Sequence, residues 1–427
     1  MLSHLFDALY LTGLTVASPY LAFKLLTDER YRFALPERFG RIPPPAGDSP
    51  RLWLHCASVG EINLSRHFIR LLGEAFPGWT VCLSTMTPTG RRLADKLFPT
   101  SHRFALPIDL SWPVRLSLDV LSPRALILVE LELWPNLILE ASRRGIPVAI
   151  VNGRISDRGF ERSYPLRRVF RSILSRVSLV CAQNATYAER FVALGAAPGA
   201  VSVTGNMKYD VLPSYDPERE RKVREEASLA GRLVLVGGST HKGEDEALIA
   251  AFEALRKDFP TLALVLAPRH PERLHAVKEA LENAGLPFCL RTEQREAVRR
   301  GLAANFDVLV VDTMGELVEL YRAADVAFVG GSLVPHGGHN VLEPAALRKP
   351  VVTGPHCFNF TEEVALLRSA DGIVQVGSEA GLGDALRTLL ARPEERERIG
   401  NLAAETLREK SGAGQRNIDL LRNIVLV

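Results

Sequence analysis

Short apolar runs alternate with stretches of helical periodicity along most of this 427-residue chain. Strands of a parallel sheet are buried on both faces and therefore appear in sequence as continuous apolar runs. Such strands alternating with helices are typical of a doubly wound α/β sheet. In the first half of the chain the predicted strands lie at 51–57, 80–84, 125–130, 147–151, 179–182 and 201–204.

A charged stretch at 214–226 interrupts this pattern, which then resumes. The later predicted strands lie at 232–236, 262–267, 308–311, 326–329 and 350–353. The chain is longer than the roughly 250–300 residues at which a single core stops growing, so two domains are expected. We predict Rossmann-like domains at 27–210 and 211–427, with a last helical stretch, 394–427, that can cross back onto the first domain.

The N-terminus contains a long apolar segment. Sixteen uncharged residues separate Asp7 from Lys24. A membrane-spanning helix needs about 20 predominantly apolar residues. Pro19 can kink the helix, and Tyr10, Tyr20 and Lys24 suit the membrane interface. We predict a membrane-anchor or interfacial helix at 1–26, with a helix buried in the first domain as the alternative.

Charge and cysteine content exclude other classes of protein. A formal net charge of +3 does not indicate a nucleic-acid partner. The five cysteines are widely spaced and form no CxxC pair, which predicts buried thiols rather than disulfides or a zinc site. Nine arginines stand between 141 and 176, against two acids. Arg167, Arg168 and Arg171 share one helix face, which is either simply solvated or a basic surface for lipid headgroups or a phosphorylated acceptor.

Polar loops follow several strands of the second half. In the densest, N–H groups at 337–340 suit a phosphate, and Glu343 can accept hydrogen bonds from a ribose diol. Arg269 ends another strand, where it can hold a phosphate and neutralise a departing nucleotide. The loops 237–240 and 312–317 lie at the same predicted sheet edge. These loops predict a nucleotide-binding half, and no cluster has metal-ligand spacing, so we expect neither a metal nor a cofactor.

The first half supplies polar strand ends of another kind. Ser58 and Glu61 follow one strand, Glu130 closes another, and Glu37 lies in a compact segment before the first strand. A buried carboxylate such as Glu130 requires a partner, either an arginine or a substrate hydroxyl. For each of these acids a helix cap or an ion pair is the structural alternative.

Seven motifs together resemble the bacterial 3-deoxy-D-manno-octulosonic acid (Kdo) transferase family. The resemblance follows the chain in order over nearly its whole length, and the most specific motifs are Glu-Leu-Glu-Leu-Trp-Pro-Asn and Gly-Asn-Met-Lys-Tyr-Asp. The motifs lie at 37–40, 57–61, 130–136, 205–210, 238–240, 267–270 and 337–343.

The resemblance implies a GT-B fold, in which two Rossmann-like domains face a cleft. It implies inverting, metal-independent transfer of Kdo from CMP-Kdo to a lipid A precursor (lipid IVA) at the cytoplasmic face of the inner membrane, in lipopolysaccharide biosynthesis. Glu37 would be the catalytic base. The implied CMP contacts are Arg269, His270, Met314, Gly315, Glu316, Gly331, Ser332, Asn340 and Glu343. The implied contacts to the sugar or acceptor are Ser58, Glu61, Glu130, Lys208, Ser239 and Thr240.

Three rival functions fit parts of the sequence. A UDP-sugar transferase would share the architecture. A non-hydrolysing UDP-sugar 2-epimerase would share the loop at 337–343 but would have no use for an apolar N-terminal anchor. A membrane-bound nucleotide-sugar binder without catalysis is the third alternative.

Overall fold

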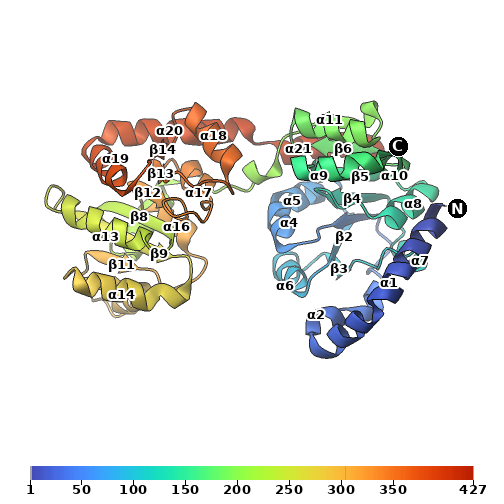
Figure 1. Cartoon of the computed structure of the whole chain (residues 1–427), viewed down its shortest axis with the longest axis horizontal. Helices are drawn as coiled ribbons and strands as arrows, with labels where there is room; N and C mark the ends of the chain where they lie inside the picture. The colour runs from blue at the N-terminus through green and yellow to red at the C-terminus, as the bar shows by residue number, and fades with distance from the viewer. Residues whose placement is uncertain (1, 303, 427) are drawn as a thin grey trace. The chain divides into compact units, whose positions relative to one another are not determined.

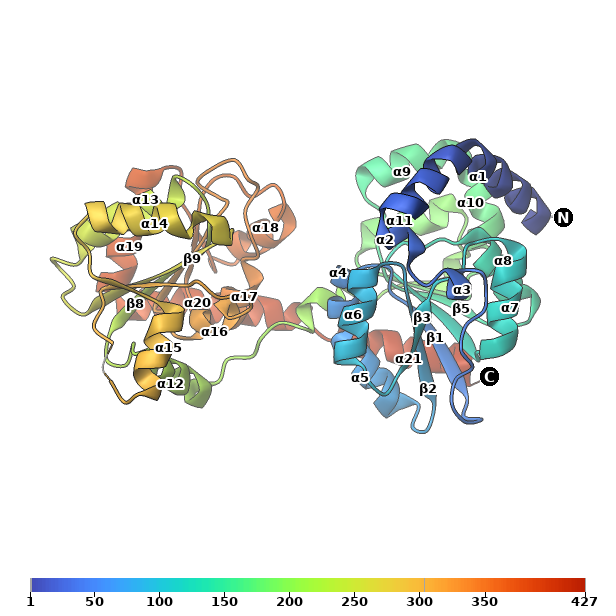
Figure 2. The same cartoon turned by 90° about the horizontal axis from the view of Figure 1, so that it is seen from below.

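The computed structural model describes residues 2–302 and 304–426, which form two compact units (Figure 1). Unit 1 comprises Met1–Val211 and Lys410–Val427, and unit 2 comprises Leu212–Glu409. The end of the chain thus returns to unit 1, where the last helix, α21 (Ala413–Val425), packs on α5 (Arg66–Ala75) (Figure 2).

Unit 1 contains a seven-stranded parallel sheet in the order β3-β2-β1-β4-β5-β6-β7. Alternate residues of the central strand β4 point to opposite faces. Leu126 and Leu128 join one hydrophobic core, whereas Ile127 and Val129 join the other. This burial on both faces is the physical cause of the continuous apolar runs. The strands are β1 (Arg51–His55), β2 (Thr80–Thr85), β3 (His102–Ala105), β4 (Ala125–Val129), β5 (Val148–Gly153), β6 (Leu179–Ala182) and β7 (Val201–Val203).

Helices cover both faces of this sheet. Besides α5 and α21, the α-helices of unit 1 are α1 (Leu2–Thr27), α2 (Glu29–Arg32), α3 (Leu35–Arg38), α4 (Val59–Leu64), α6 (Pro88–Leu97), α7 (Ser111–Leu121), α8 (Pro135–Arg143), α9 (Asp157–Ser163), α10 (Arg167–Leu174) and α11 (Ala185–Leu194). Short 3-10 turns are η1 (Tyr164–Leu166), η2 (Pro198–Ala200) and η3 (Met207–Tyr209).

Unit 2 repeats this plan, with a seven-stranded parallel sheet in the order β10-β11-β9-β8-β12-β13-β14. Its strands are β8 (Leu233–Thr240), β9 (Leu262–Pro268), β10 (Phe288–Leu290), β11 (Val308–Val310), β12 (Val326–Val329), β13 (Val351–Thr353) and β14 (Val374–Gln375). Its helices are α12 (Pro217–Glu226), α13 (Glu244–Leu255), η4 (Pro271–Arg273), α14 (Leu274–Asn283), α15 (Arg291–Arg299), α16 (Leu317–Arg322), α17 (Leu342–Ala346), α18 (Thr361–Ser369), α19 (Glu379–Ala391) and α20 (Pro393–Lys410).

The strand order of each sheet reverses at its first strand. In unit 1 the reversal lies between β1 and β4, and in unit 2 it lies between β8 and β12. In open α/β sheets, ligands bind outside the carboxyl ends of the strands at such a switch point. The topology therefore selects one place in each unit where a ligand site is expected.

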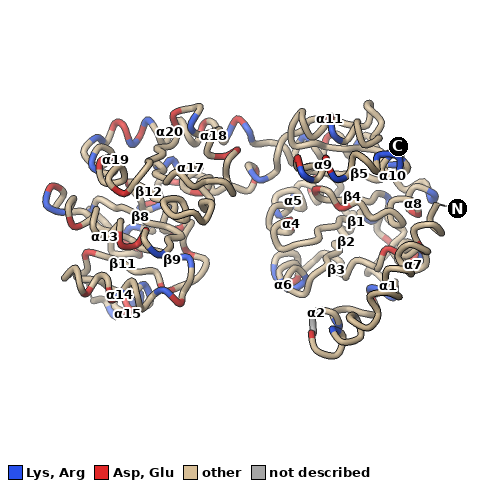
Figure 3. Tube along the Cα trace, viewed as in Figure 1, with Lys and Arg blue, Asp and Glu red and all other residues tan. Residues whose placement is uncertain are grey.

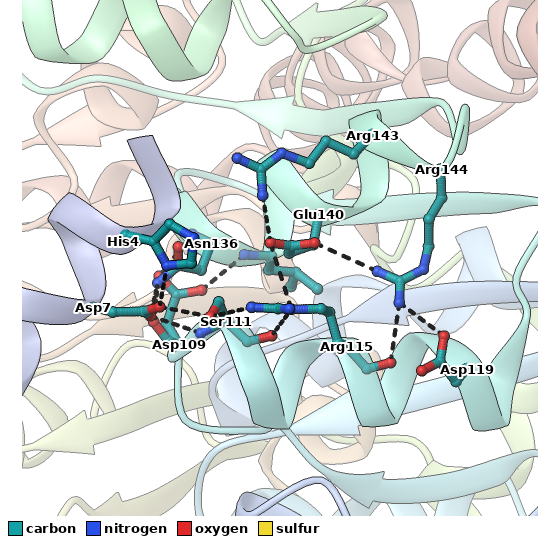
Figure 4. A network of polar contacts seen from close by, with 11 residues as sticks. His4, Asp7, Asp109, Ser111, Arg115, Asp119, Asn136, Glu140, Arg143 and Arg144 are labelled. Atoms are coloured by element: carbon teal, nitrogen blue, oxygen red, sulfur yellow. Dashed lines mark hydrogen bonds and ion pairs between the residues drawn. The ribbon is translucent and has the colours of Figure 1, made fainter. Parts of the chain in front are cut away.

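The helix α1 is attached to unit 1 by its first turns. Phe6 is buried, and the Asp7 carboxylate accepts hydrogen bonds from the Ser111 N–H (2.7 Å), the Ser111 hydroxyl (2.5 Å) and Asn136 Nδ2 (3.1 Å) (Figure 4). Beyond these turns the helix is largely uncovered, and Val16 is 78% exposed. The alternative of a helix buried in the first domain is therefore wrong for most of its length. No helix among the described residues is long and apolar enough to cross a bilayer.

Candidate functional site

One buried carboxylate, Glu244, connects the two loops at the unit 2 switch point. Its Oε2 accepts from the N–H groups of His241 (2.9 Å) and Gly331 (2.7 Å). Its Oε1 accepts from the N–H groups of Ser332 (2.8 Å) and Leu333 (2.9 Å). The residue is 0% exposed, so these four bonds replace its hydration. Glu244 thereby fixes the turn after β8 against the loop after β12.

This arrangement limits what some predicted donor-site residues can contact. The N–H groups of Gly331 and Ser332 point to Glu244, and the buried Ser332 hydroxyl donates to the Val329 carbonyl (2.6 Å). The Thr240 hydroxyl is buried and donates to Asp245. A ligand could reach these groups only after existing bonds had broken. The nearby Ser239 has a φ of 54°, a strained backbone conformation that is often found at functional sites.

A histidine cluster lies at the same switch point; its members are His241, His270, His336 and His339. His241 Nε2 lies 2.9 Å from His339 Nε2, and the His336 ring stacks on His241 with a centroid separation of 4.1 Å. The edge of His270 approaches His241 at 5.6 Å. Burial lowers the pKa of both central rings, and that of His339 falls to about 4. The two central imidazoles are therefore neutral at pH 7.

The predicted phosphate and ribose ligands flank this cluster in sequence. Arg269 and His270 follow β9 and are exposed, and the Arg269 N–H donates to the Thr240 carbonyl (3.0 Å). Within the described part of the chain, the Arg269 guanidinium has no hydrogen bond or ion pair. Glu343 is half-buried in α17, and burial raises its pKa whereas Asn340 opposes that shift. A free guanidinium and a half-buried carboxylate suit a phosphate and a ribose diol respectively.

The loop at 312–317 is attached to α15 through the side chain of Glu316. Glu316 pairs with Arg291 (3.3 Å) and Arg295 and accepts from the Thr313 hydroxyl. Gly315 has a φ of 86°, which permits the tight turn. Met314 is 75% exposed. In this loop the Glu316 side chain is therefore engaged by protein groups, and Met314 is accessible.

The unit 1 switch point carries a cluster of carboxylates. Glu61 Oε2 accepts from the Ala57 N–H (2.8 Å), and its Oε1 accepts from the Ser58 hydroxyl (2.9 Å), so both predicted residues share one helix cap at the start of α4. Burial raises the pKa of Glu61 to about 7, and the negative charges of Glu132 and Glu130 contribute. A carboxyl that titrates near neutrality at a switch point is a candidate general base.

Glu130 and Glu132 both follow β4. Glu130 has a φ of 61°, and burial raises its pKa whereas Arg154 lowers it. Glu132 accepts from Trp134 Nε1 (3.0 Å) and lies 3.7 Å from Nε2 of the fully buried His55. Glu132 is the second carboxylate of the motif at 130–136, but neither Glu132 nor His55 is among the predicted contacts to the sugar or acceptor. The available signal was their position, because each lies at the carboxyl end of a strand that borders the switch point.

Glu37, the predicted catalytic base, lies elsewhere in unit 1. Its Oε2 accepts from the Ala105 N–H (2.6 Å) at the end of the edge strand β3 and pairs with Arg91 Nη1 (3.2 Å). β3 is separated from β1 by β2. The structure therefore holds Glu37 through an ion pair at the sheet edge and places Glu61 at the switch point.

The motif at 205–210 has a structural part. Asp210 accepts from the N–H groups of Gly412 (2.5 Å) and Gly414 (2.6 Å), which attaches the beginning of α21 to unit 1. Within the same motif, Lys208 Nζ lies 5.0 Å from the centre of the Tyr209 ring. Asp210 therefore has a structural role in this motif, because it attaches the C-terminal helix to unit 1.

The arginines of the stretch 141–176 have different environments: some are paired with acids and others are exposed to solvent. Arg143 and Arg144 are neutralised by Glu140 and Asp119 (Figure 4). On α10, by contrast, Arg167, Arg168 and Arg171 are exposed. The tube in Figure 3 shows basic residues along this helix. Leu166, directly before α10, and Val169 within it are also exposed, by 58% and 45%. This helix presents apolar and cationic side chains to solvent together.

Comparison with known proteins agrees with this architecture. Residues 34–211 match the model of the 3-deoxy-D-manno-octulosonic-acid transferase (kdotransferase) family, and residues 233–406 match glycosyl transferases group 1. The 3-deoxy-D-manno-octulosonic acid transferase of Haemophilus influenzae is 37% identical over 94% of each chain, and that of Bordetella pertussis is 33% identical over 91% of each. The UDP-GlcNAc 2-epimerase of Neisseria meningitidis aligns with a TM-score of 0.59 at 15% identity, over 87% of this chain and 100% of that one. At that identity the epimerase shows the fold alone.

Two Rossmann-like units with polar switch points define a GT-B-like glycosyltransferase, as the sequence predicted. The 37% identity to the Haemophilus influenzae Kdo transferase, over nearly the whole length of both chains, identifies the family within this class. The chain belongs to the Kdo transferase family.

Proposed function

We propose that this enzyme transfers Kdo from CMP-Kdo to a lipid A precursor, lipid IVA, with inversion and without a metal. The observation that carries the proposal is the pair of switch points, one rich in cationic and imidazole groups and the other in carboxylates. Sequence similarity to Kdo transferases over 94% of the chain supports the sugar. The CMP-sugar would bind unit 2, and the acceptor would bind unit 1.

The donor half follows from the groups beside Arg269. In the reaction the bond between the anomeric carbon and the phosphate oxygen breaks, and its electron pair leaves with CMP. A guanidinium that is free to bind that phosphate stabilises the leaving group. We propose that Asn340 and Glu343 hold the ribose, with His270 and the exposed Met314 at the periphery of the nucleotide. Gly315, Glu316, Gly331 and Ser332 would then act by shaping the loops.

The acceptor half requires a base. The acceptor hydroxyl oxygen forms the new bond to the anomeric carbon, and its proton passes to a carboxylate. The resemblance to Kdo transferases implies this role for Glu37, and the position of Glu37 in unit 1, away from the nucleotide-binding unit 2, supports the proposal. Glu61 is the second candidate, favoured by its pKa of about 7. Glu130, Lys208, Ser58 and Ser239 would orient the sugar or the acceptor.

We propose that the protein works at the cytoplasmic face of the inner membrane. The exposed apolar part of α1 supports this proposal, because Leu9 and Val16 are 67% and 78% exposed. The exposed α10 helix supports it independently, since its arginines would meet anionic headgroups while Leu166 and Val169 meet the interface. Together they would bring unit 1 to a lipid-embedded acceptor.

A mass-resolved assay with CMP-Kdo and a tetraacylated lipid A precursor tests the function. We expect a product heavier by one or more Kdo residues, together with released CMP. The same assay with UDP-sugars in place of CMP-Kdo tests whether the enzyme uses one of the rival donors. Turnover of a UDP-sugar but not of CMP-Kdo would refute the proposal, and tight CMP-Kdo binding without turnover would favour a non-catalytic binder.

Two variants separate the candidate bases. Replacing the true base by Gln should lower kcat by roughly 10²–10⁴, while CMP affinity changes little. If Glu61 is the base, wild-type kcat rises with pH through about 7 as that carboxyl loses its proton, and Glu61→Gln loses this rise. If Glu37→Gln retains more than about a tenth of the activity, Glu37 is not the base.

A further inference from the structure

The centre of the histidine cluster has room for only one hydrogen. The rings of His241 and His339 are nearly coplanar (4°), and their Nε2 atoms are 2.9 Å apart. A hydrogen bond between two imidazole nitrogens needs one N–H donor and one lone pair. The contact therefore survives when the pair is neutral or when it shares one positive charge. Two imidazolium rings would bring two N–H groups face to face and break it.

The tight packing of His339 keeps this contact in place. A Cβ added to Gly331 would lie 3.0 Å from His339 Cδ2, so a side chain at that position would displace the ring. Gly331 is in turn held by its hydrogen bond to Glu244, which also binds the His241 N–H. One buried carboxylate thus positions both members of the pair.

The ionisable groups that face the pair are mostly basic side chains. Arg269 and His270 face it from the end of β9, His336 from the loop after β12, and Arg273 from η4. The acids facing it come from α13: Glu244 is occupied by four N–H groups, and Asp245 is paired with Arg273 (2.6 Å). Burial, the partner ring and Arg269 together keep the pKa of His339 low. An anion bound to Arg269 removes part of that penalty and attracts a proton.

We propose that binding of the donor phosphate beside Arg269 makes the His241–His339 pair take up one proton, which converts the pair into a shared cation within the donor site. The inference rests on the proposed function, because it takes the CMP phosphate as the anion. The proton comes from solvent and binds Nδ1 of the ring that donates its Nε2–H, so the single hydrogen between the two Nε2 atoms stays in place and their contact is kept. The pair is then a positioning element that adds positive charge only when the anionic donor is present.

Proton-linked binding has a measurable signature. If one proton is taken up, CMP affinity rises as pH falls, by up to about tenfold per pH unit. Calorimetric titration of the full chain with CMP at pH 7, in two buffers of different ionisation enthalpy, measures the number of protons. We expect net uptake of a sizeable fraction of a proton in the wild type and almost none in His339→Asn. His275→Asn, an exposed histidine on α14, is the matched control and should retain the uptake.

The comparison between variants removes the contribution of CMP itself. The CMP phosphate has a second pKa of about 6, but this ionisation is common to all variants. Equal uptake in His339→Asn and the wild type would overturn the proposal, as would CMP binding by the wild type without uptake. A merely structural role for His339 would change affinity and leave the proton count unchanged.

Two further measurements cover a variant that fails to fold or to bind. His241→Asn removes the other ring, so uptake of wild-type size in that variant also contradicts the proposal. In the wild type alone, CMP affinity that is independent of pH between 6.5 and 8, after correction for CMP ionisation, contradicts it too. If the wild type does not bind CMP, the proposed donor site itself is wrong, and that outcome is distinct from binding without uptake.

Discussion

Glu244→Gln should lower the free energy of unfolding of unit 2, because two backbone N–H groups lose their acceptor while the shape of the side chain is kept. The glutamine has nearly the same shape, but its NH₂ group is a donor and replaces one carboxylate oxygen. Each oxygen of Glu244 accepts two N–H groups, so either orientation of the amide leaves two buried N–H groups facing a donor. A buried polar group without its partner costs about 1–3 kcal/mol, which gives a loss of roughly 2–6 kcal/mol.

The expected change in Tm follows from this loss of stability and from the size of unit 2. In a domain of 150–250 residues, 1 kcal/mol corresponds to about 2–4 °C in Tm, so we expect the unit 2 transition to fall by at least about 4 °C. CMP affinity should fall as well, because the loop after β12 loses its attachment to His241.

The distribution of tryptophan permits a clean assay. All four tryptophans, at 53, 79, 112 and 134, lie in unit 1. Tryptophan fluorescence therefore follows unit 1, whereas scanning calorimetry records both units. Glu244→Gln should shift the calorimetric transition of unit 2 and leave the fluorescence transition unchanged. Glu253→Gln, at an exposed position of the same helix, is the control. A Tm within about 1 °C of that control would refute the reasoning.

Three other predictions concern the donor, the metal and the membrane. Arg269→Ala should weaken CMP binding tenfold to a hundredfold, because a charge-assisted hydrogen bond contributes about 1.5–3 kcal/mol; unchanged affinity by calorimetry in a folded variant would exclude the phosphate contact. Turnover should survive excess EDTA, and loss of activity that Mg²⁺ restores would contradict metal independence. Val16→Gln combined with Phe23→Gln should reduce sedimentation with anionic vesicles, leaving salt-sensitive binding through α10. These substitutions test the membrane contact better than truncation, which would also remove Phe6 and Asp7 from unit 1.

Much of the architecture could be predicted from the sequence, because burial on both faces leaves a direct trace in a parallel strand. The run at 125–130 is apolar throughout since β4 contributes alternate side chains to two cores. The polar loops after 240, 268 and 329 could also be predicted to lie together at one edge of the sheet. Parallel strands bring their carboxyl ends together, so residues that follow them meet.

The site itself was only partly predictable. Arg269 and Glu343 could be selected because their chemistry matches a nucleotide and their positions follow strands. Glu244 could not, because an acid at the start of a helix is ordinary in sequence. Its four partners include N–H groups 87 to 89 residues away, and only the fold shows that it reaches them.

The sequence alone determined two Rossmann-like domains, the family and the loops that carry the chemistry, because these depend on local patterns and motifs. The tertiary structure decided which side chains meet. It brought His241 to His339 across 98 residues, attached α1 to Ser111 and Asn136 through Asp7, and separated Glu37 at β3 from Glu61 at the switch point. The physical reason is the same in each case. Strand order and helix packing determine the distances between residues that are remote in sequence, and burial and pKa depend on those distances.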